Sequence, residues 1–256
     1  MTTSTMTTSA AAPTARNPIA SVIRLHFVNP VATIAAPWGI LGAIFVANLA
    51  IWAIIIGSAA EADRAKISEG LGYSGSVSFI FVYMMVVAVQ AINATFPFAL
   101  GFSTTRRDYY LGTAITFVIL SLVYSVGLSI LSAVELATDG WGLGGRMFSA
   151  MYLGDGTVLE RWFIYFALLL LFFFTGSAAA AVWVRWKGLG LTVFFVGVGF
   201  LLIGLLALVG LTDSWAAVGS WFVRMGWVGS YAWSLVITAI AAITGYFILR
   251  RATTKS

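Results

Sequence analysis

The sequence predicts an all-α integral membrane protein in which six helices cross the bilayer. Of its 256 residues, 61% are hydrophobic and only 9% are charged, whereas soluble domains carry roughly a quarter charged residues. The mean hydropathy is +0.98. Six apolar stretches are each long enough for a hydrocarbon core of about 30 Å, which takes roughly 20 helical residues.

The six predicted spans contain no Asp, Glu, Lys, Arg or His. This absence favours insertion, because one charge at a helix centre costs roughly 2.5–3.5 kcal/mol. The spans are residues 37–59, 76–100, 111–134, 162–184, 188–211 and 225–249.

The segments before and after the spans complete the organisation. Residues 1–16 are rich in Thr, Ser and Ala and predict a flexible cytoplasmic tail. Residues 17–30 alternate apolar Val22 and Ile23 with Arg24 and His26 at helical spacing, which predicts an amphipathic helix in the headgroup layer. A frayed extension of the first span is the alternative. Residues 31–251 form the six-helix domain, and 252–256 form a second cytoplasmic tail.

The distribution of basic residues predicts that both termini are cytoplasmic, in the cell membrane. With the N-terminus inside, nine basic residues are cytoplasmic and five are external, which follows the positive-inside rule. The nine are Arg16, Arg24, Arg106, Arg107, Arg185, Lys187, Arg250, Arg251 and Lys255. The five are Arg64, Lys66, Arg146, Arg161 and Arg224.

The last external segment, residues 212–224, is unusually aromatic. It carries Trp215, Trp221 and Phe222, and Trp227 follows closely. Tryptophans near span ends normally anchor helices at the membrane interface. A short re-entrant or surface helix pair is the alternative interpretation.

The composition also excludes several kinds of chemistry on this chain. Without Cys there is no thiol nucleophile and no Cys-ligated metal, and one histidine, His26, does not make a metal site. No Walker loop or GxSxG elbow is present, so we expect no catalytic residues, no metal, no cofactor and no enzymatic activity. The basic residues are scattered between spans, which argues against a nucleic-acid partner.

Two amides in the second span are candidates for a translocation path. Gln90 and Asn93 are three residues apart and so are neighbours on one face of a helix. Polar groups at membrane depth often line a substrate path. Ordinary hydrogen bonding between helices is the alternative explanation.

The turn after the second span is the most informative stretch. Pro97 and Gly101 loosen the helix as it leaves the membrane, and Ser103, Thr104 or Thr105 can cap a short new helix carrying Arg106, Arg107 and Asp108. A short, polar, rigid element of this kind suits docking of a soluble partner. A charged turn that merely anchors two helices is equally open on the residues alone.

The order of these parts resembles the permease subunit of an ATP-binding-cassette (ABC) transporter with type-2 exporter topology. The run G-F-S-T-T-R-R-D-Y-Y after span two is similar to the coupling helix of that family. The resemblance implies a second permease chain and a separately encoded ATPase that binds ATP and magnesium. Its docking surface would be Phe102, Ser103, Thr104, Thr105, Arg106, Arg107, Asp108 and Tyr109.

We therefore expect the membrane-spanning subunit of an ABC exporter. Spans without ionisable groups cannot relay ions, so the energy would come from the partner. One alternative is a non-transporting scaffold or sensor that docks a cytosolic protein. A second is a lipid-modifying enzyme using the external carboxylates Glu135, Asp139, Asp155 and Glu160, which are more simply ordinary loop charges. The sequence leaves open the substrate and whether the two permeases are identical.

Overall fold

The computed structural model describes residues 17–252, and the predicted tails fall largely outside that range. Within it, the chain is helical and contains no strand. In chain order the elements are α1 (Pro18–His26), η1 (Val31–Ala35), α2 (Ala36–Ser58), η2 (Glu61–Asp63), α3 (Arg64–Leu71), α4 (Ser78–Gln90), η3 (Ala91–Thr95), α5 (Phe96–Gly101), α6 (Arg106–Ala137), η4 (Gly140–Gly144), η5 (Met151–Leu153), α7 (Val158–Leu211), α8 (Trp215–Ala232) and α9 (Ser234–Arg250).

The predicted all-α architecture is confirmed, with five helices long and apolar enough to cross a membrane. The fourth, α7, has 54 residues and would be about 80 Å long at 1.5 Å per residue, far more than one bilayer needs. Its backbone is broken at Lys187, where φ is 57° and ψ is −148°. The break falls between the fourth and fifth predicted spans.

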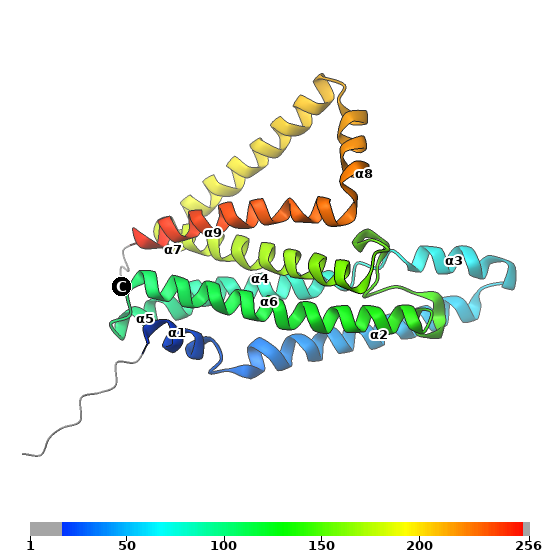
Figure 1. The fold of residues 1–256 in the computed structure, drawn as a ribbon, viewed down its shortest axis with the longest axis horizontal. Coiled ribbons are helices and arrows are strands. Elements are labelled where there is room, and N and C mark those ends of the chain that lie inside the picture. The colour runs from blue at the N-terminus through cyan, green and yellow to red at the C-terminus, as the bar shows by residue number, and fades with distance from the viewer. Residues whose placement is uncertain (1–16, 253–256) are drawn as a thin grey trace, which may run out of the picture.

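The helices α2, α4, α6 and α9 and the first half of α7 run along one long axis and give the bundle two ends, whereas α8 and the second half of α7 run across it (Figure 1). One end, here called the α1 end, holds α1, the turn between α5 and α6, the break at Lys187 and the last residue of α9. The opposite end, here called the α3 end, holds α3 and the long loop between α6 and α7 (Figure 1).

The helix predicted within residues 17–30 is present as α1, although it ends at His26. The side chain of Asn17 caps it by accepting a hydrogen bond of 3.1 Å from the backbone N–H of Ile19. Pro18 suits the first turn because its missing N–H would have no helical partner there. On α1, Val22 is buried at the contact with α6.

The core lies between α4, α6 and the first half of α7, which are extensively packed together. Phe117 of α6 stacks on Phe173 of α7 with ring centroids 4.7 Å apart. Gly176 lets α7 approach α4, because a Cβ there would lie 2.7 Å from the carbonyl oxygen of Met85. Close helix contact through glycine is typical of membrane bundles.

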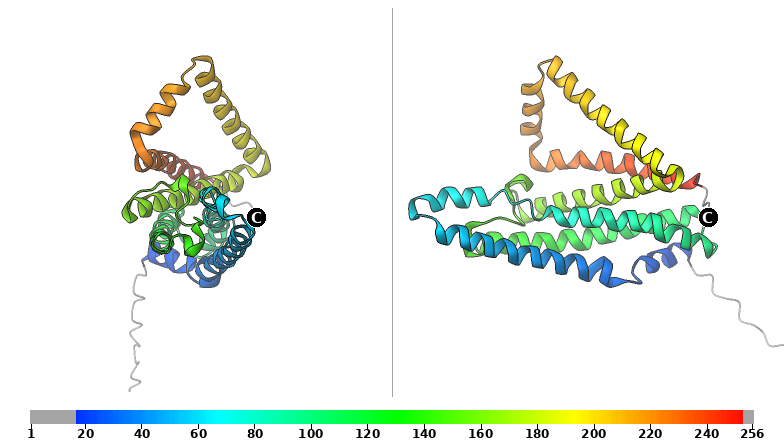
Figure 2. Two further views of the ribbon diagram at one scale, coloured as in Figure 1. Left: turned by 90° about the vertical axis from the view of Figure 1, so that its right-hand side faces the viewer. Right: turned by 180° about the vertical axis from the view of Figure 1, so that it is seen from behind.

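Residues 188–211 form an arm that leaves the bundle at the Lys187 break (yellow in Figure 1, with further views in Figure 2). Most of its apolar side chains are exposed, including Leu189 at 81% and Leu211 at 88%. The segment that follows is helical, as one sequence interpretation proposed, since α8 begins at Trp215 and is broken at Gly226. These apolar surfaces are compatible with a membrane-embedded chain.

Candidate functional site

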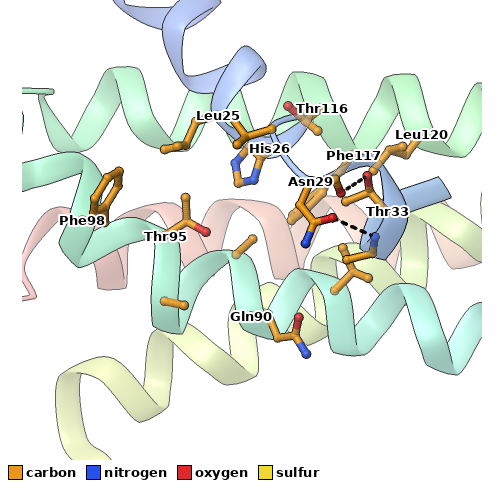
Figure 3. A pocket seen from close by; sticks show the side chains of 15 residues that line it. Leu25, His26, Asn29, Thr33, Gln90, Thr95, Phe98, Thr116, Phe117 and Leu120 are labelled. Atoms are coloured by element: carbon orange, nitrogen blue, oxygen red, sulfur yellow. Dashed lines mark hydrogen bonds between the residues drawn. The ribbon is translucent and has the colours of Figure 1, made fainter. Parts of the chain in front are cut away.

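A cavity of about 420 Å³ lies beside α1, in the half of the bundle nearer the α1 end (Figure 3). It is enclosed by α1, η1, the α4–η3–α5 segment and α6. Its lining residues are Leu25, His26, Val28, Asn29, Ala32, Thr33, Val87, Gln90, Ala91, Ala94, Thr95, Phe98, Thr116, Phe117 and Leu120.

Two of the three π-helical segments in the described part of the chain, η1 and η3, contribute to the cavity wall. A π turn bonds i to i+5 and is found frequently at functional sites. The wider turn displaces backbone carbonyls from the regular helical ladder, and buried carbonyls need other donors.

Three tyrosines supply those donors. The phenol of Tyr83 donates to the carbonyl of Ala32 at 3.0 Å, and Tyr124 donates to that of Thr33 at 2.8 Å. Tyr109 donates to the carbonyl of Ala91 at 2.6 Å. Each phenol comes from a helix other than the one it stabilises, so the two π segments are fixed by neighbouring spans.

His26 reaches the cavity from the last turn of α1. Its Nε2 lies 2.9 Å from the hydroxyl oxygen of Thr113 on α6. Burial lowers the pKa of His26 from 6.5 to about 4, so the imidazole is neutral near pH 7. Gly112 permits this approach, because a Cβ there would lie 2.7 Å from the Cβ of Val22.

The cavity is mainly apolar, and its polar side chains are uncharged. Its polar side chains are His26, Asn29, Thr33, Gln90, Thr95 and Thr116, and no Asp, Glu, Lys or Arg lines it. Figure 3 shows His26 and Asn29 on one side and Thr95 on the other. Neutral donors and acceptors in an apolar wall can hold a neutral polar group but cannot neutralise a charge.

The two amides of the sequence hypothesis are placed differently. Both are exposed, and of the two only Gln90 is among the residues that line the cavity. The π segment η3 begins directly after Gln90. Asn93 lies within η3, whose wider turn changes the rotation between the two positions.

The turn after α5 lacks the short separate helix that the sequence suggested. Thr105 is the cap, accepting a hydrogen bond of 3.1 Å from the backbone N–H of Asp108. The helix that it caps is not a short separate one, because Arg106 begins the 32-residue α6. Phe102 is 71% exposed at the α1 end, and Ser103 there has a left-handed φ of 61°.

The charged residues of this turn have unequal surroundings. The Nη1 of Arg106 donates a hydrogen bond of 3.1 Å to the carbonyl of Arg250, the last residue of α9. Arg107 is exposed. Tyr109 is fully buried, so it faces the interior rather than any docking surface. Thr104 and Asp108 are partly buried.

The external carboxylates are dispersed among structural roles. Asp155 pairs with Arg146 at 2.9 Å, and Glu160 accepts a hydrogen bond of 2.6 Å from the N–H of Thr157 in a capping box. Asp139 is exposed.

Glu135 is fully buried and accepts five hydrogen bonds. The backbone N–H groups of Met147, Phe148 and Ser149 donate at 3.0, 3.1 and 2.7 Å, the hydroxyl of Ser149 at 2.7 Å and the indole of Trp141 at 3.3 Å. The carboxylate thus holds the long loop over the α3 end, which is a structural role.

Among residues 17–252, no group of three or more His, Asp or Glu side chains is placed to hold a metal ion. The cavity and the α5–α6 turn are two features of this region that offer binding surfaces. Comparisons of the chain with protein-family models, with curated proteins and with solved structures found no match.

Proposed function

We propose that this chain is the membrane-spanning permease subunit of an ABC exporter, driven by a separately encoded ATPase that docks on the α5–α6 turn. One observation carries the proposal. The turn that joins α5 to α6 is only four residues long, and it connects directly to two walls of the cavity. A partner that moves the turn would therefore move both walls.

The turn is rigid enough to transmit such a movement. The hydroxyl of Thr105 donates to the carboxylate of Asp108 at 2.7 Å and fixes the first turn of α6. Arg106 ties the same turn to the end of α9. A displacement at the α1 end would thus move several spans together. Docking elements convert the movement of a partner into a change of helix arrangement in this way.

The docking surface in this proposal is the exposed part of the turn. Phe102 supplies an apolar contact and Arg107 a positive charge. Arg106 and Thr105 act by holding the turn in place. ATP and magnesium would bind the partner, and a second permease chain would complete the translocation path beside Gln90.

The proposal also includes six spans with both termini in the cytoplasm. The break at Lys187 supports a division of α7 into two spans. Arg24, Arg106, Arg107, Arg185 and Lys187 belong to elements at the α1 end, and a positive end favours the cytoplasmic side.

The experiment is affinity purification of the tagged full-length chain from native membranes, with identification of the copurifying proteins by mass spectrometry. We expect an ABC ATPase in near-stoichiometric amount. Arg107→Glu and Phe102→Ala should each reduce its recovery at least fivefold. Arg64→Glu, at the exposed start of α3, is the matched control and should leave recovery unchanged.

Normal ATPase recovery with both turn variants would overturn the assigned docking surface. If the wild-type chain recovered no ATPase but a different cytosolic protein whose binding depends on Arg107, the exporter proposal would be wrong. The scaffold or sensor function would then account for the same surface.

A further inference from the structure

We propose that the cavity lined by His26, Asn29 and Gln90 binds an uncharged, lipid-soluble amphiphile whose head bears hydroxyl or ester carbonyl groups, such as a diacylglycerol. The site lies within one chain, between the N-terminal helix and three spans. It does not require the ATPase of the proposed function.

The hydrogen-bonding groups of the wall point to such a ligand. In the described part of the chain, the amide of Gln90 makes no hydrogen bond, and neither do Nδ1 of His26 and Nδ2 of Asn29. The remaining polar side-chain atoms of His26 and Asn29 have partners within the chain. Nε2 of His26 contacts the hydroxyl of Thr113, and Oδ1 of Asn29 accepts a hydrogen bond of 3.3 Å from the N–H of Ala32. Unused donors and acceptors therefore lie along the wall and the exposed rim of one cavity, where Asn29 and Gln90 are both exposed.

The chemistry of the ligand follows from the absence of charge in the wall. Every polar lining side chain is neutral, including His26 near pH 7. A phosphate or ammonium group in this position would lose its hydration without gaining a counter-ion, which is strongly unfavourable. Hydroxyl and ester groups are matched by amide and imidazole partners at ordinary cost.

The route of entry is lateral. Val28 and Phe98 are lining residues, yet their side chains are 74% and 54% exposed on the outside of the chain. In a bilayer such apolar rims would contact acyl chains rather than water. A ligand can therefore enter from the membrane and leave its tail between Val28 and Phe98 while its head reaches Gln90.

The size of the cavity fits one head group with the start of its tail. Its volume of about 420 Å³ lies within the range of roughly 300–1,000 Å³ that is usual for small-molecule sites. Its inner wall is apolar at Phe117 and Leu120, which favours carbon adjacent to the head group.

The test uses the purified full-length chain in nanodiscs with a diacylglycerol carrying a diazirine near its ester groups. After photolysis, peptide mapping should find label in residues 28–33 and 90–98. Dioctanoylglycerol should displace it at least tenfold more effectively than dioctanoyl phosphatidic acid, which has the same chains and differs only by its phosphate. Equal or better displacement by the anionic lipid would overturn the proposal, as would label spread without saturation over residues 188–211.

Two variants separate binding in the cavity from nonspecific lipid contact. Ala94→Trp fills the cavity and should abolish displaceable labelling, whereas Ala53→Trp, on the exposed surface of α2, should not change it. Gln90→Leu keeps the volume but removes the hydrogen bonds and should weaken competition three- to tenfold. Unchanged competition in both cavity variants would exclude this site. None of these measurements involves ATP, so failure of the exporter proposal would leave their results interpretable.

Discussion

The phenol of Tyr109, in the first turn of α6, donates a hydrogen bond of 2.6 Å to the carbonyl oxygen of Ala91, the first residue of η3. This bond joins the turn at the α1 end to the wall of the cavity. It also satisfies a backbone acceptor at the start of a π-helical segment, where the regular helical ladder changes.

Tyr109→Phe should therefore destabilise the protein by about 1 kcal/mol, because the buried carbonyl of Ala91 loses its donor. The measurement is the thermal midpoint in detergent micelles. Tyr73→Phe is the matched control, since the side chain of Tyr73 is 64% exposed, and it should leave the midpoint unchanged. Equal midpoints for the two variants would show that the bond contributes no stability.

Glu135→Gln should destabilise the α3 end by at least about 3 kcal/mol. The NH₂ of the new amide would face backbone N–H groups that need an acceptor. The remaining backbone N–H groups would donate to a neutral oxygen instead of a charged one. Opening of the loop should expose Arg146, so trypsin should cleave there much faster. Asp139→Asn is the control, because this exposed position has a φ of 49°, which Asn tolerates well. Cleavage at the wild-type rate in Glu135→Gln would refute the structural role.

Gly176→Ala should destabilise the bundle by about 1–3 kcal/mol, because the added Cβ would meet the carbonyl oxygen of Met85 at 2.7 Å. Gly42→Ala adds the same atom where no other atom lies within 4 Å. It should be neutral or slightly stabilising through helix propensity. Thermal midpoints compare the two directly, and a midpoint for Gly176→Ala at or above that of Gly42→Ala would contradict the close packing of α4 and α7.

Stability should depend on pH through His26. Its pKa is lowered in the folded chain from 6.5 to about 4, so protonation favours the unfolded state. The stability that depends on a neutral imidazole is fully present above pH 6.5 and is lost as the pH falls toward 4. The loss should be roughly 2 kcal/mol after allowance for solvent screening. The measurement compares the unfolding midpoints of wild type and His26→Gln at pH 7 and pH 4.5. The wild type should lose more stability between these pH values than the variant, and parallel pH profiles would contradict the prediction.

The long apolar helices could be predicted from the sequence because apolar length and the absence of charge are sufficient signals. The predicted second span, 76–100, nearly coincides with the helical stretch Ser78–Gly101, and the third lies inside Arg106–Ala137. The break at Lys187 was also foreseeable, since Arg185 and Lys187 interrupt an apolar run.

The cavity could not be predicted in the same way. A π turn leaves no periodic signal in apolar residues, so the placement of Gln90 without Asn93 depends on backbone geometry. His26 was assigned to the headgroup layer because its neighbours are amphipathic. Its contact with Thr113, 87 residues away, arises from tertiary packing at Gly112. The sole histidine was the one available signal.

The arm formed by residues 188–211 exposes apolar side chains over most of its surface. Its different faces therefore present similar apolar surfaces to their surroundings. Beyond Phe194, which packs on the bundle, no side-chain hydrogen bond or ion pair ties it to the rest of the described chain. The arm is joined to α8 through Thr212–Ser214 as well as to the bundle at Lys187, so these two connections and its apolar contacts set its position.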